Sequence, residues 1–300
     1  MLSPVPALAR QPAGRLTWRE LRDLVQPQVP LLSAPRPGLR GLCGVCHGPA
    51  AAGSARCFQC DLHSQCAPGS LADTVVPVAF AIKGGPHARS LWQYKSGQSR
   101  AARRAAGGAA SPAAEVGLNL ACGVASGPAA AVAARQLLAL LLVFLHDHGR
   151  CVWRAAGSTG PTHLAVVPTA RGRPGPHPLR ALISPYVTAP WAELSVLPGG
   201  HPVRELDPDR FAAAPLPGAR VLLVDDTWTT GATAQSAAMA LRRAGASSVA
   251  IVVLGRHVRD GGPLARPFRP QLCPVHPGDI GIPATPSILA SGEPPDHKVA

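Results

Sequence analysis

Four cysteines near the start of the chain form two Cys-x-x-Cys pairs, Cys43 with Cys46 and Cys57 with Cys60. Ten residues separate the pairs, the spacing at which two tight turns close a tetrahedral Zn²⁺ site. The surrounding residues are mostly Gly, Ala and polar, and they include too few apolar side chains to fold without a bound metal ion. Because four thiolates leave no open coordination position, we predict a structural zinc site in preference to a redox or catalytic one.

Several other cysteines and histidines offer additional ligands. Cys273 and His276 stand two residues apart and could reach a metal together, but the Pro-rich segment around them positions ligands poorly. The others are interpreted as neighbours of the two pairs or as core residues: His47, His63, Cys66, Cys122 and Cys151.

The segment 221–233, VLLVDDTWTTGAT, combines groups that could bind a sugar phosphate. Four apolar residues predict a buried strand that ends at Asp225 and Asp226, and a hydroxyl-rich turn with Gly231 then opens a helix. Ligands of open α/β sheets bind at this edge, and a helix start favours phosphate. Adjacent carboxylates suit the cis hydroxyls of a ribose, or an Mg²⁺ shared with a phosphate. A ribose 5-phosphate matches every group, whereas ordinary N-capping accounts for only one of them.

This segment is similar to the binding motif for phosphoribosyl diphosphate (PRPP) in type I phosphoribosyltransferases, and the cysteine pairs ahead of it match the competence protein ComF subgroup. The resemblance covers roughly residues 43–256. Residues 91–97, LWQYKSG, stand where these proteins carry a lysine-containing segment, and residues 166–173, VVPTARGR, resemble their Val-Pro strand end with downstream arginines. After residue 173 the chain departs from the usual Arg-Gly-Phe-Asn-Gln stretch.

The resemblance implies an α/β fold of the type I phosphoribosyltransferase kind, with a parallel sheet flanked by helices and preceded by a small zinc ribbon. It assigns the ribose hydroxyls to Asp225 and Asp226, places Mg²⁺ with PRPP, and makes residues 168–173 a pyrophosphate-side loop that includes Arg171 and Arg173. The resemblance assigns the 5-phosphate to residues of the turn and the helix start, namely Thr227, Thr229, Thr230, Gly231 and Thr233. A larger residue at position 231 is expected to block the phosphate and leave the fold intact.

Three further residues carry open alternatives. Trp228 either stacks on a ligand or covers the edge of the sheet, and Lys95 either contacts phosphate or is solvated at a helix end. His177 stands between prolines and is interpreted as structural rather than as an acid-base group.

Two functions follow from the resemblance. In the first, the protein is an enzyme in which a nucleophile displaces pyrophosphate from C1 of PRPP; no general base is visible, so the acceptor is not named. In the second, the protein is non-catalytic and associated with nucleic acid, as in DNA uptake, and its PRPP pocket is vestigial or regulatory.

The charge composition bears on the partner. Lys and Arg outnumber Asp and Glu by 29 to 16, a net charge of +13, and lysine occurs only at positions 83, 95 and 298. Guanidinium groups suit phosphates, so PRPP or another ribose 5-phosphate and non-specific nucleic acid are the favoured partners. A compositional bias that supports only solubility is the alternative.

The chain is 46% hydrophobic and 15% charged, which predicts a folded core between less regular ends. We expect a Pro-rich segment at 1–40 with a helix over 17–25, a zinc ribbon at 41–68, the α/β domain at 69–256, and a flexible Pro/Gly-rich tail at 257–300. Within the domain, helices are predicted over 87–95, 128–148 and 231–244, with a linker to residue 114. The predicted strands are 74–82 with an interruption at Pro77, 163–168, 193–197, 220–225 and 248–254.

The longest uninterrupted apolar stretch, residues 137–145, is much shorter than the roughly 20 residues that span a bilayer. Residues 1–30 lack the basic, apolar and small-residue succession of a secretory signal. We therefore expect no membrane span and a cytoplasmic protein.

Overall fold

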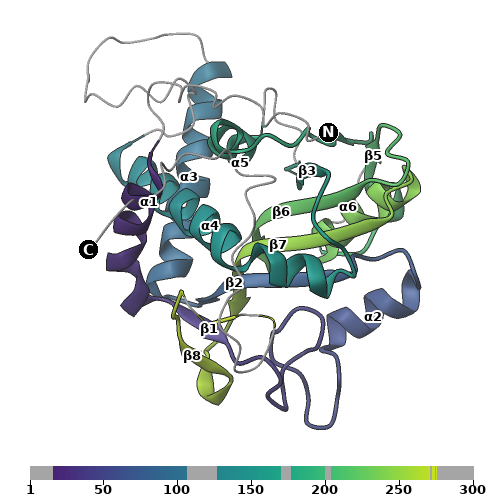
Figure 1. Ribbon diagram of the computed structural model, residues 1–300, viewed down its shortest axis with the longest axis horizontal. Coiled ribbons are helices and arrows are strands. Elements are labelled where there is room, and N and C mark those ends of the chain that lie inside the picture. The colour runs from purple at the N-terminus through teal and green to yellow at the C-terminus, as the bar shows by residue number, and fades with distance from the viewer. Residues whose placement is uncertain are drawn as a thin grey trace, which may run out of the picture.

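A six-stranded mixed sheet lies at the centre of the protein (Figure 1). The computed structural model describes residues 16–106, 127–169, 177–199, 204–270, 272, 273 and 275. The strands of the sheet are β1 (Ser33–Pro35), β2 (Thr74–Ile82), β3 (His163–Val166), β6 (Arg220–Trp228), β7 (Ser248–Val258) and β8 (Ala265–Pro267). Their order is β3-β6-β7-β2-β1-β8. The first four run parallel, whereas β1 is antiparallel to β2 and β8 to β1. The α/β class is therefore confirmed, with a mixed rather than an all-parallel sheet.

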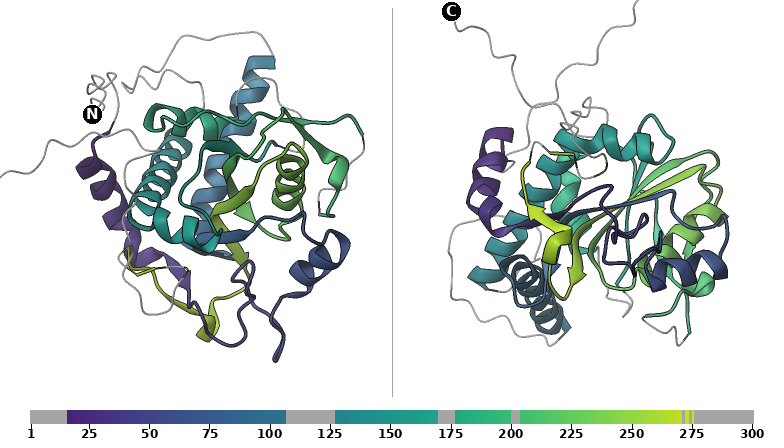
Figure 2. Two further views of the ribbon diagram at one scale, coloured as in Figure 1. Left: turned by 45° about the vertical axis from the view of Figure 1, so that its right-hand side comes forward. Right: turned by 90° about the horizontal axis from the view of Figure 1, so that it is seen from below.

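Helices cover both faces of this sheet (Figure 2). One face carries α1 (Trp18–Val25), α3 (Pro86–Ala106), α4 (Pro128–Ala155) and α5 (Pro178–Ile183), and the other carries α6 (Ala232–Arg243). Successive side chains of a strand point to opposite faces, and β6 follows this rule: Leu222 and Val224 enter one core cluster, while Val221 and Leu223 enter the other. Both faces are buried, which is why these strands are apolar throughout.

The remaining elements are short. A two-stranded antiparallel sheet joins β4 (Leu194–Val196) to β5 (Phe211–Ala213), and α2 (Phe58–Cys66) follows the second cysteine pair. The strand predicted at 193–197 therefore forms outside the central sheet, because its partner is the nearby β5. The 3-10 helices are η1 (Gln26–Leu31), η2 (Ser184–Tyr186), η3 (Pro208–Arg210) and η4 (Gly262–Leu264).

The helix predicted at 17–25 forms as α1, and it begins with a capping box. The Thr17 hydroxyl accepts a hydrogen bond from the Glu20 backbone N–H at 3.2 Å, and the Glu20 carboxylate accepts one from the Thr17 N–H at 2.7 Å. Leu21 and Val25 are buried, and the helix packs against α4. The Pro-rich N-terminal segment thus contributes a helix to the main core, and β1 joins the sheet.

α4 is longer than the sequence predicted. Gly149, the expected end of the helix, lies inside it and is buried. The next residues Cys151, Val152 and Trp153 are also buried, so packing offsets the cost of about 1 kcal/mol that an internal glycine adds.

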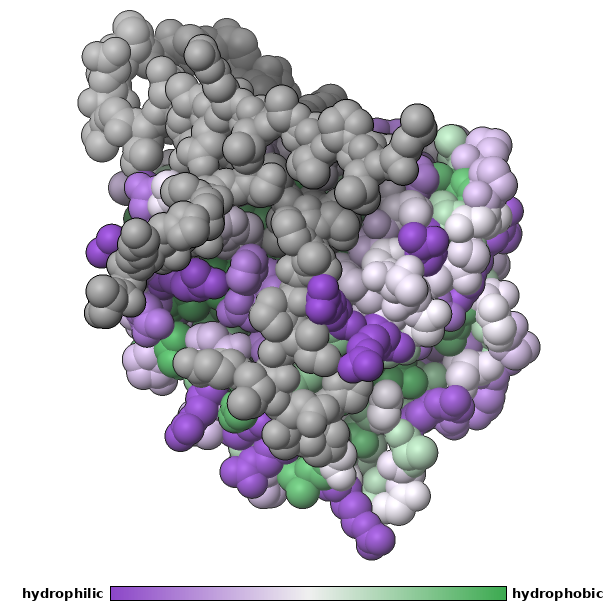
Figure 3. All heavy atoms as spheres, in the orientation of Figure 1, coloured by the Kyte–Doolittle hydropathy of each residue, from purple (hydrophilic) through white to green (hydrophobic). Residues whose placement is uncertain are grey.

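By length and composition α4 could cross a membrane, although its longest uninterrupted apolar run, residues 137–145, is too short to do so. In its most apolar 18-residue window, however, 67% of the residues are buried inside the protein. On the face drawn in Figure 3 the coloured surface is largely hydrophilic or weakly polar, with scattered apolar residues. Length and composition are therefore weak support for a span, since a core helix passes the same test.

β2 continues through Pro77 without interruption. Pro77 pairs with Val253 of β7 on one side, and β1 reaches β2 only at Phe80, opposite Ser33. Among the described strands, β2 therefore has a neighbour on one side only at Pro77, namely β7.

Two segments expected to be irregular contain regular structure. The linker predicted after residue 95 is helical through Ala106, and the remainder of it lies outside the described residues. The tail predicted from residue 257 begins with the end of β7 and then supplies η4 and β8. β8 is held in place because it pairs with β1 and because Phe268, just after it, is buried in the core.

Candidate metal centre and ligand site

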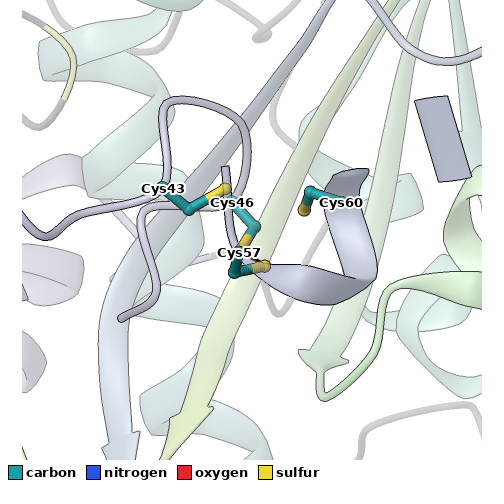
Figure 4. Close-up of side chains that lie close together, drawn as sticks. All are labelled: Cys43, Cys46, Cys57 and Cys60. Carbon is teal, nitrogen blue, oxygen red and sulfur yellow. Dashed lines mark hydrogen bonds between the residues drawn. The ribbon is translucent and has the colours of Figure 1, made fainter. Parts of the chain in front are cut away.

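The two cysteine pairs converge into one cluster (Figure 4). The Sγ atoms of Cys43, Cys46, Cys57 and Cys60 lie within 4.8 Å of one another, and those of Cys46 and Cys57 are 3.7 Å apart. Three of the four residues are buried. These cysteines lie close enough to hold one metal ion.

The first pair is shaped by a tight backbone turn. Cys43 donates its N–H to the Gly48 carbonyl at 2.8 Å, and the Val45 N–H donates to Cys43 Sγ at 3.4 Å. Hydrogen bonds from Cys46 and then from the other two thiols of the cluster hold the pKa of the Cys43 thiol below its usual range. This is the knuckle geometry that the sequence predicts for a metal-binding pair.

The second pair lies at a helix start. Cys57 is the N-cap residue of α2 and Cys60 lies in the first turn, where the positive end of the helix dipole favours thiolates. His47, His63 and Cys66, interpreted from the sequence as bystanders, do not belong to the four-residue group.

The two carboxylates of the candidate ligand site stand on β6 itself, because the strand runs on to Trp228 instead of ending at residue 225. Asp225 Oδ1 accepts a hydrogen bond from the Asp226 N–H at 2.8 Å. Asp226 Oδ1 accepts one from the Thr227 hydroxyl at 3.0 Å. All three residues are only partly exposed, so their polar groups converge in a half-sheltered position at the carboxyl end of the sheet.

Burial, and secondly the negative charge of Asp226, raise the pKa of Asp225 to about 7, while Lys95 opposes this shift. Ionising both of two adjacent, half-buried carboxylates is unfavourable in free energy, because the two negative charges repel each other and are poorly solvated. Such a perturbed pair is characteristic of a site that receives a cation or a polar ligand.

Lys95 completes this group from α3, 131 residues away in the sequence. Its Nζ lies 2.9 Å from Asp226 Oδ1 and donates to Thr227 Oγ1 at 2.6 Å. The Asp226 side chain is 13% exposed and that of Lys95 46%. Lys95 lies inside α3 rather than at a helix end, and its half-exposed side chain turns toward the carboxylates. Its contact with a phosphate stays a prediction.

The turn after β6 leads directly into a helix start. Gly231 is the N-cap of α6 with φ of +83°, and the Ala232 N–H donates to Thr230 Oγ1 at 3.3 Å. First-turn N–H groups have no intrahelical partners, and they carry the positive end of the helix dipole. A helix thus begins shortly after the carboxylates, as expected from the sequence, and its role as a phosphate site stays a prediction.

Trp228 covers the core and does not face a ligand. Its side chain is 1% exposed and belongs to the same apolar cluster as α6. The indole packs so closely on Gly231 that a Cβ at position 231 would lie 2.0 Å from Trp228 Cζ2. The expectation that a larger residue at 231 would leave the fold intact is therefore wrong, because the space is already filled by Trp228.

Two buried arginines that the sequence does not single out hold this turn. Arg256 on β7 donates to the carbonyl oxygens of Trp228 at 3.3 Å and Thr229 at 3.0 Å. Arg210 donates to Thr233 Oγ1 at 3.0 Å, at the start of α6. No local pattern could have identified either one: the predicted strand ended before residue 256, and Arg210 lies in a Pro-punctuated stretch.

The neighbouring strand β3 brings a further predicted segment to the same edge. Val166 pairs with Val224 in the parallel register, so Pro168 follows β3 beside the carboxylates of β6. Arg171 and Arg173 lie outside the described residues, as do Cys122 and His276. His177 caps α5 by accepting the Leu179 N–H at Nδ1 (3.2 Å), which agrees with its structural interpretation.

A scan of the chain against protein-family models gives no match, and searches of curated proteins and of solved structures give none either. The side chains and their geometry therefore carry the functional argument.

Proposed function

We propose that the protein binds PRPP, with Mg²⁺, at the carboxyl end of β6, and that the four-cysteine cluster holds a structural Zn²⁺. The observation that supports the ligand most is the Asp225 and Asp226 pair, which stands shortly before the start of α6 and whose Asp226 Oδ1 lies 2.9 Å from Lys95 Nζ. Carboxylates, cation and helix start each complement a different part of a ribose phosphate ester.

The chemistry of each group suggests which part of PRPP it would bind. Asp225 and Asp226 accept hydrogen bonds from the ribose hydroxyls or share an Mg²⁺ with the diphosphate, and either role favours the ionised form of Asp225. The N–H groups and hydroxyls at 229–233 receive the 5-phosphate. Arg210, buried behind Thr233, adds positive charge there, and Lys95 can exchange its carboxylate partner for an incoming phosphate.

If the protein is an enzyme, the reaction is displacement at C1 of PRPP. The bond from C1 to the pyrophosphate oxygen breaks, a bond from C1 to the nucleophile forms, and the nucleophile loses its proton to solvent or to a base. This chain contributes orientation of the ribose and stabilisation of the leaving charge. Mg²⁺, when bound, neutralises the diphosphate.

The zinc proposal rests on the donor set. Four sulfur ligands suit Zn²⁺ and exclude Mg²⁺ or Ca²⁺, which take oxygen ligands. All four positions of a tetrahedral ion would be filled by protein, so the ion would stabilise the segment 41–68 without taking part in chemistry.

Isothermal titration of the full chain with PRPP and Mg²⁺ tests the ligand. Replacing Asp225 and Asp226 together by Asn should weaken binding on the order of a hundredfold or more, because each charged hydrogen bond contributes about 1.5 to 3 kcal/mol. The control is Asp209→Asn, an acidic residue whose side chain is 79% exposed, which should bind as the wild type does. If millimolar PRPP with Mg²⁺ produces no heat and no thermal shift, the proposal is refuted.

Assays for pyrophosphate release with candidate acceptor bases then separate an enzyme from a binding protein. The nucleic-acid alternative rests on the net charge of +13, and its binding should be insensitive to sequence and strongly salt-dependent. Part of the arginine charge is used internally, since Arg242 pairs with Asp73 and Arg256 is buried. PRPP binding without turnover, together with salt-dependent binding of DNA, would favour that alternative.

A further inference from the structure

We propose that His148, Cys151 and Cys273 form a second metal site, separate from the four-cysteine cluster. The candidate ligand atoms of these three residues lie within 4.8 Å of one another. Each residue is at most 3% exposed. α4 supplies His148 and Cys151, which are three residues apart and hence on one face of the helix, and Cys273 comes from the chain after β8. The proposal does not depend on PRPP binding.

The orientation of His148 is that of a metal ligand. Its Nε2 lies 2.5 Å from the Pro270 carbonyl oxygen, which can only accept, so the proton is on Nε2 and Nδ1 keeps its lone pair. Nδ1 is buried and has no hydrogen-bond partner among the described residues. Leaving such a group unsatisfied is costly, and metal-ligating histidines usually donate their other ring N–H to a carbonyl or a carboxylate in this way.

The backbone at Cys273 repeats a feature of the first cluster. The Val275 N–H donates to Cys273 Sγ at 3.4 Å, just as the Val45 N–H donates to Cys43 Sγ at 3.4 Å. The Cys273 carbonyl accepts a hydrogen bond from Arg266 at 2.9 Å, which fixes the turn. Cys273 is therefore held by defined contacts, although the Pro-rich segment around it was expected to position ligands poorly.

One imidazole nitrogen and two sulfurs are a donor set for Zn²⁺, with one position of a tetrahedral ion left for a fourth ligand. A bound ion would fasten the chain after β8 to the C-terminal part of α4. Packing already brings the two together there, because Phe268 and Val275 contact the core cluster to which α4 belongs. The competing interpretations of the same sulfurs are simple core packing and a disulfide between Cys151 and Cys273.

Zinc analysis of the full chain, purified under reducing conditions and equilibrated with Zn²⁺, tests the site. We expect two ions per chain in the wild type, and one in Cys151→Ser, Cys273→Ser and His148→Gln. The matched control, Cys66→Ser, alters an exposed thiol outside both clusters and should retain two. Cys43→Ser with Cys57→Ser should lose the other ion only, which shows that the two sites are independent.

A single ion in the wild type, with an unchanged count in Cys151→Ser, would overturn the proposal. So would a Cys151 to Cys273 disulfide found by mass analysis of the non-reduced protein. If the variants fail to fold, titration of the apo wild type with Co²⁺ decides the matter. A second equivalent must add thiolate charge-transfer absorption, and its absence would likewise refute the second site.

Discussion

The Arg256 guanidinium lies directly against the backbone of Gly48, so closely that a Cβ at position 48 would approach Nη2 to 2.5 Å. The Gly48 carbonyl accepts the Cys43 N–H in the first cysteine turn. The same guanidinium donates to the Thr229 carbonyl in the turn after β6. One buried side chain therefore connects the four-cysteine cluster to the candidate ligand site.

Gly48→Ala should destabilise the protein by about 1 to 3 kcal/mol, the usual cost of inserting a methyl group into a filled space. The added methyl displaces the guanidinium, which then loses hydrogen bonds to the Trp228, Thr229 and His257 carbonyls. Equilibrium unfolding in urea measures the change. The control is Gly44→Ala in the same turn, where a Cβ would meet only the Ala55 oxygen at 3.4 Å and the loss should be much smaller. Equal losses in the two variants would contradict the role of Arg256.

Asp225→Asn should stabilise the ligand-free protein above pH 7. The pKa of Asp225 is raised from 3.8 to about 7, so the native protein holds a proton that the unfolded chain releases. The contribution of protonated Asp225 to the free energy of unfolding is therefore fully present below about pH 4, and it is lost as the pH rises to 7. Asparagine keeps the hydrogen-bond acceptor without the charge, so its advantage should grow from near zero at pH 4 to a few kcal/mol above pH 7.

Urea unfolding of the two proteins between pH 4 and pH 8, without Mg²⁺ or PRPP, measures this difference. Asp209→Asn, which removes an exposed carboxylate, should show no comparable trend. A difference between Asp225→Asn and the wild type that does not vary with pH would argue against the raised pKa.

Cys43→Ser or Cys57→Ser should remove one metal ion from the chain and expose residues 41–68 to proteolysis. The sulfurs of Cys46 and Cys57 are 3.7 Å apart, and the segment has little apolar material with which to hold that arrangement on its own. Metal analysis and limited proteolysis followed by mass spectrometry measure both effects, with Cys66→Ser as the control. Unchanged metal content would show that the cluster holds no ion.

Interactions within a few residues explain which elements could be predicted. The Thr17 and Glu20 capping box marks α1, and Gly231 followed by an alanine-rich face marks α6. The apolar runs at 220–225 and 248–254 identify two adjacent parallel strands, although both strands extend further. In each case the determining contacts are local or follow from the period of a single element.

The parts that could not be predicted depend on contacts between distant segments. The pairing of Lys95 with Asp226 requires the placement of α3 beside the end of β6. β8 forms because its residues pair with the unpaired side of β1. The contacts of Arg256 join three separate segments, so no window of sequence contains them. The same holds for the convergence of His148 and Cys273.

Gly231→Ala should be far more destabilising than a glycine replacement that costs only backbone strain. Gly231 and Gly84 have nearly the same left-handed conformation, with φ of +83° and +77°. Alanine at either position incurs about 1 to 2 kcal/mol for adopting it. A Cβ at 84 meets no atom within 4 Å, whereas one at 231 would lie 2.0 Å from the buried indole of Trp228. Urea unfolding should therefore show Gly84→Ala within about 2 kcal/mol of the wild type and Gly231→Ala lower by several kcal/mol more. Similar losses in both variants would mean that Trp228 yields easily, in which case the turn that precedes α6 would not be held by its packing.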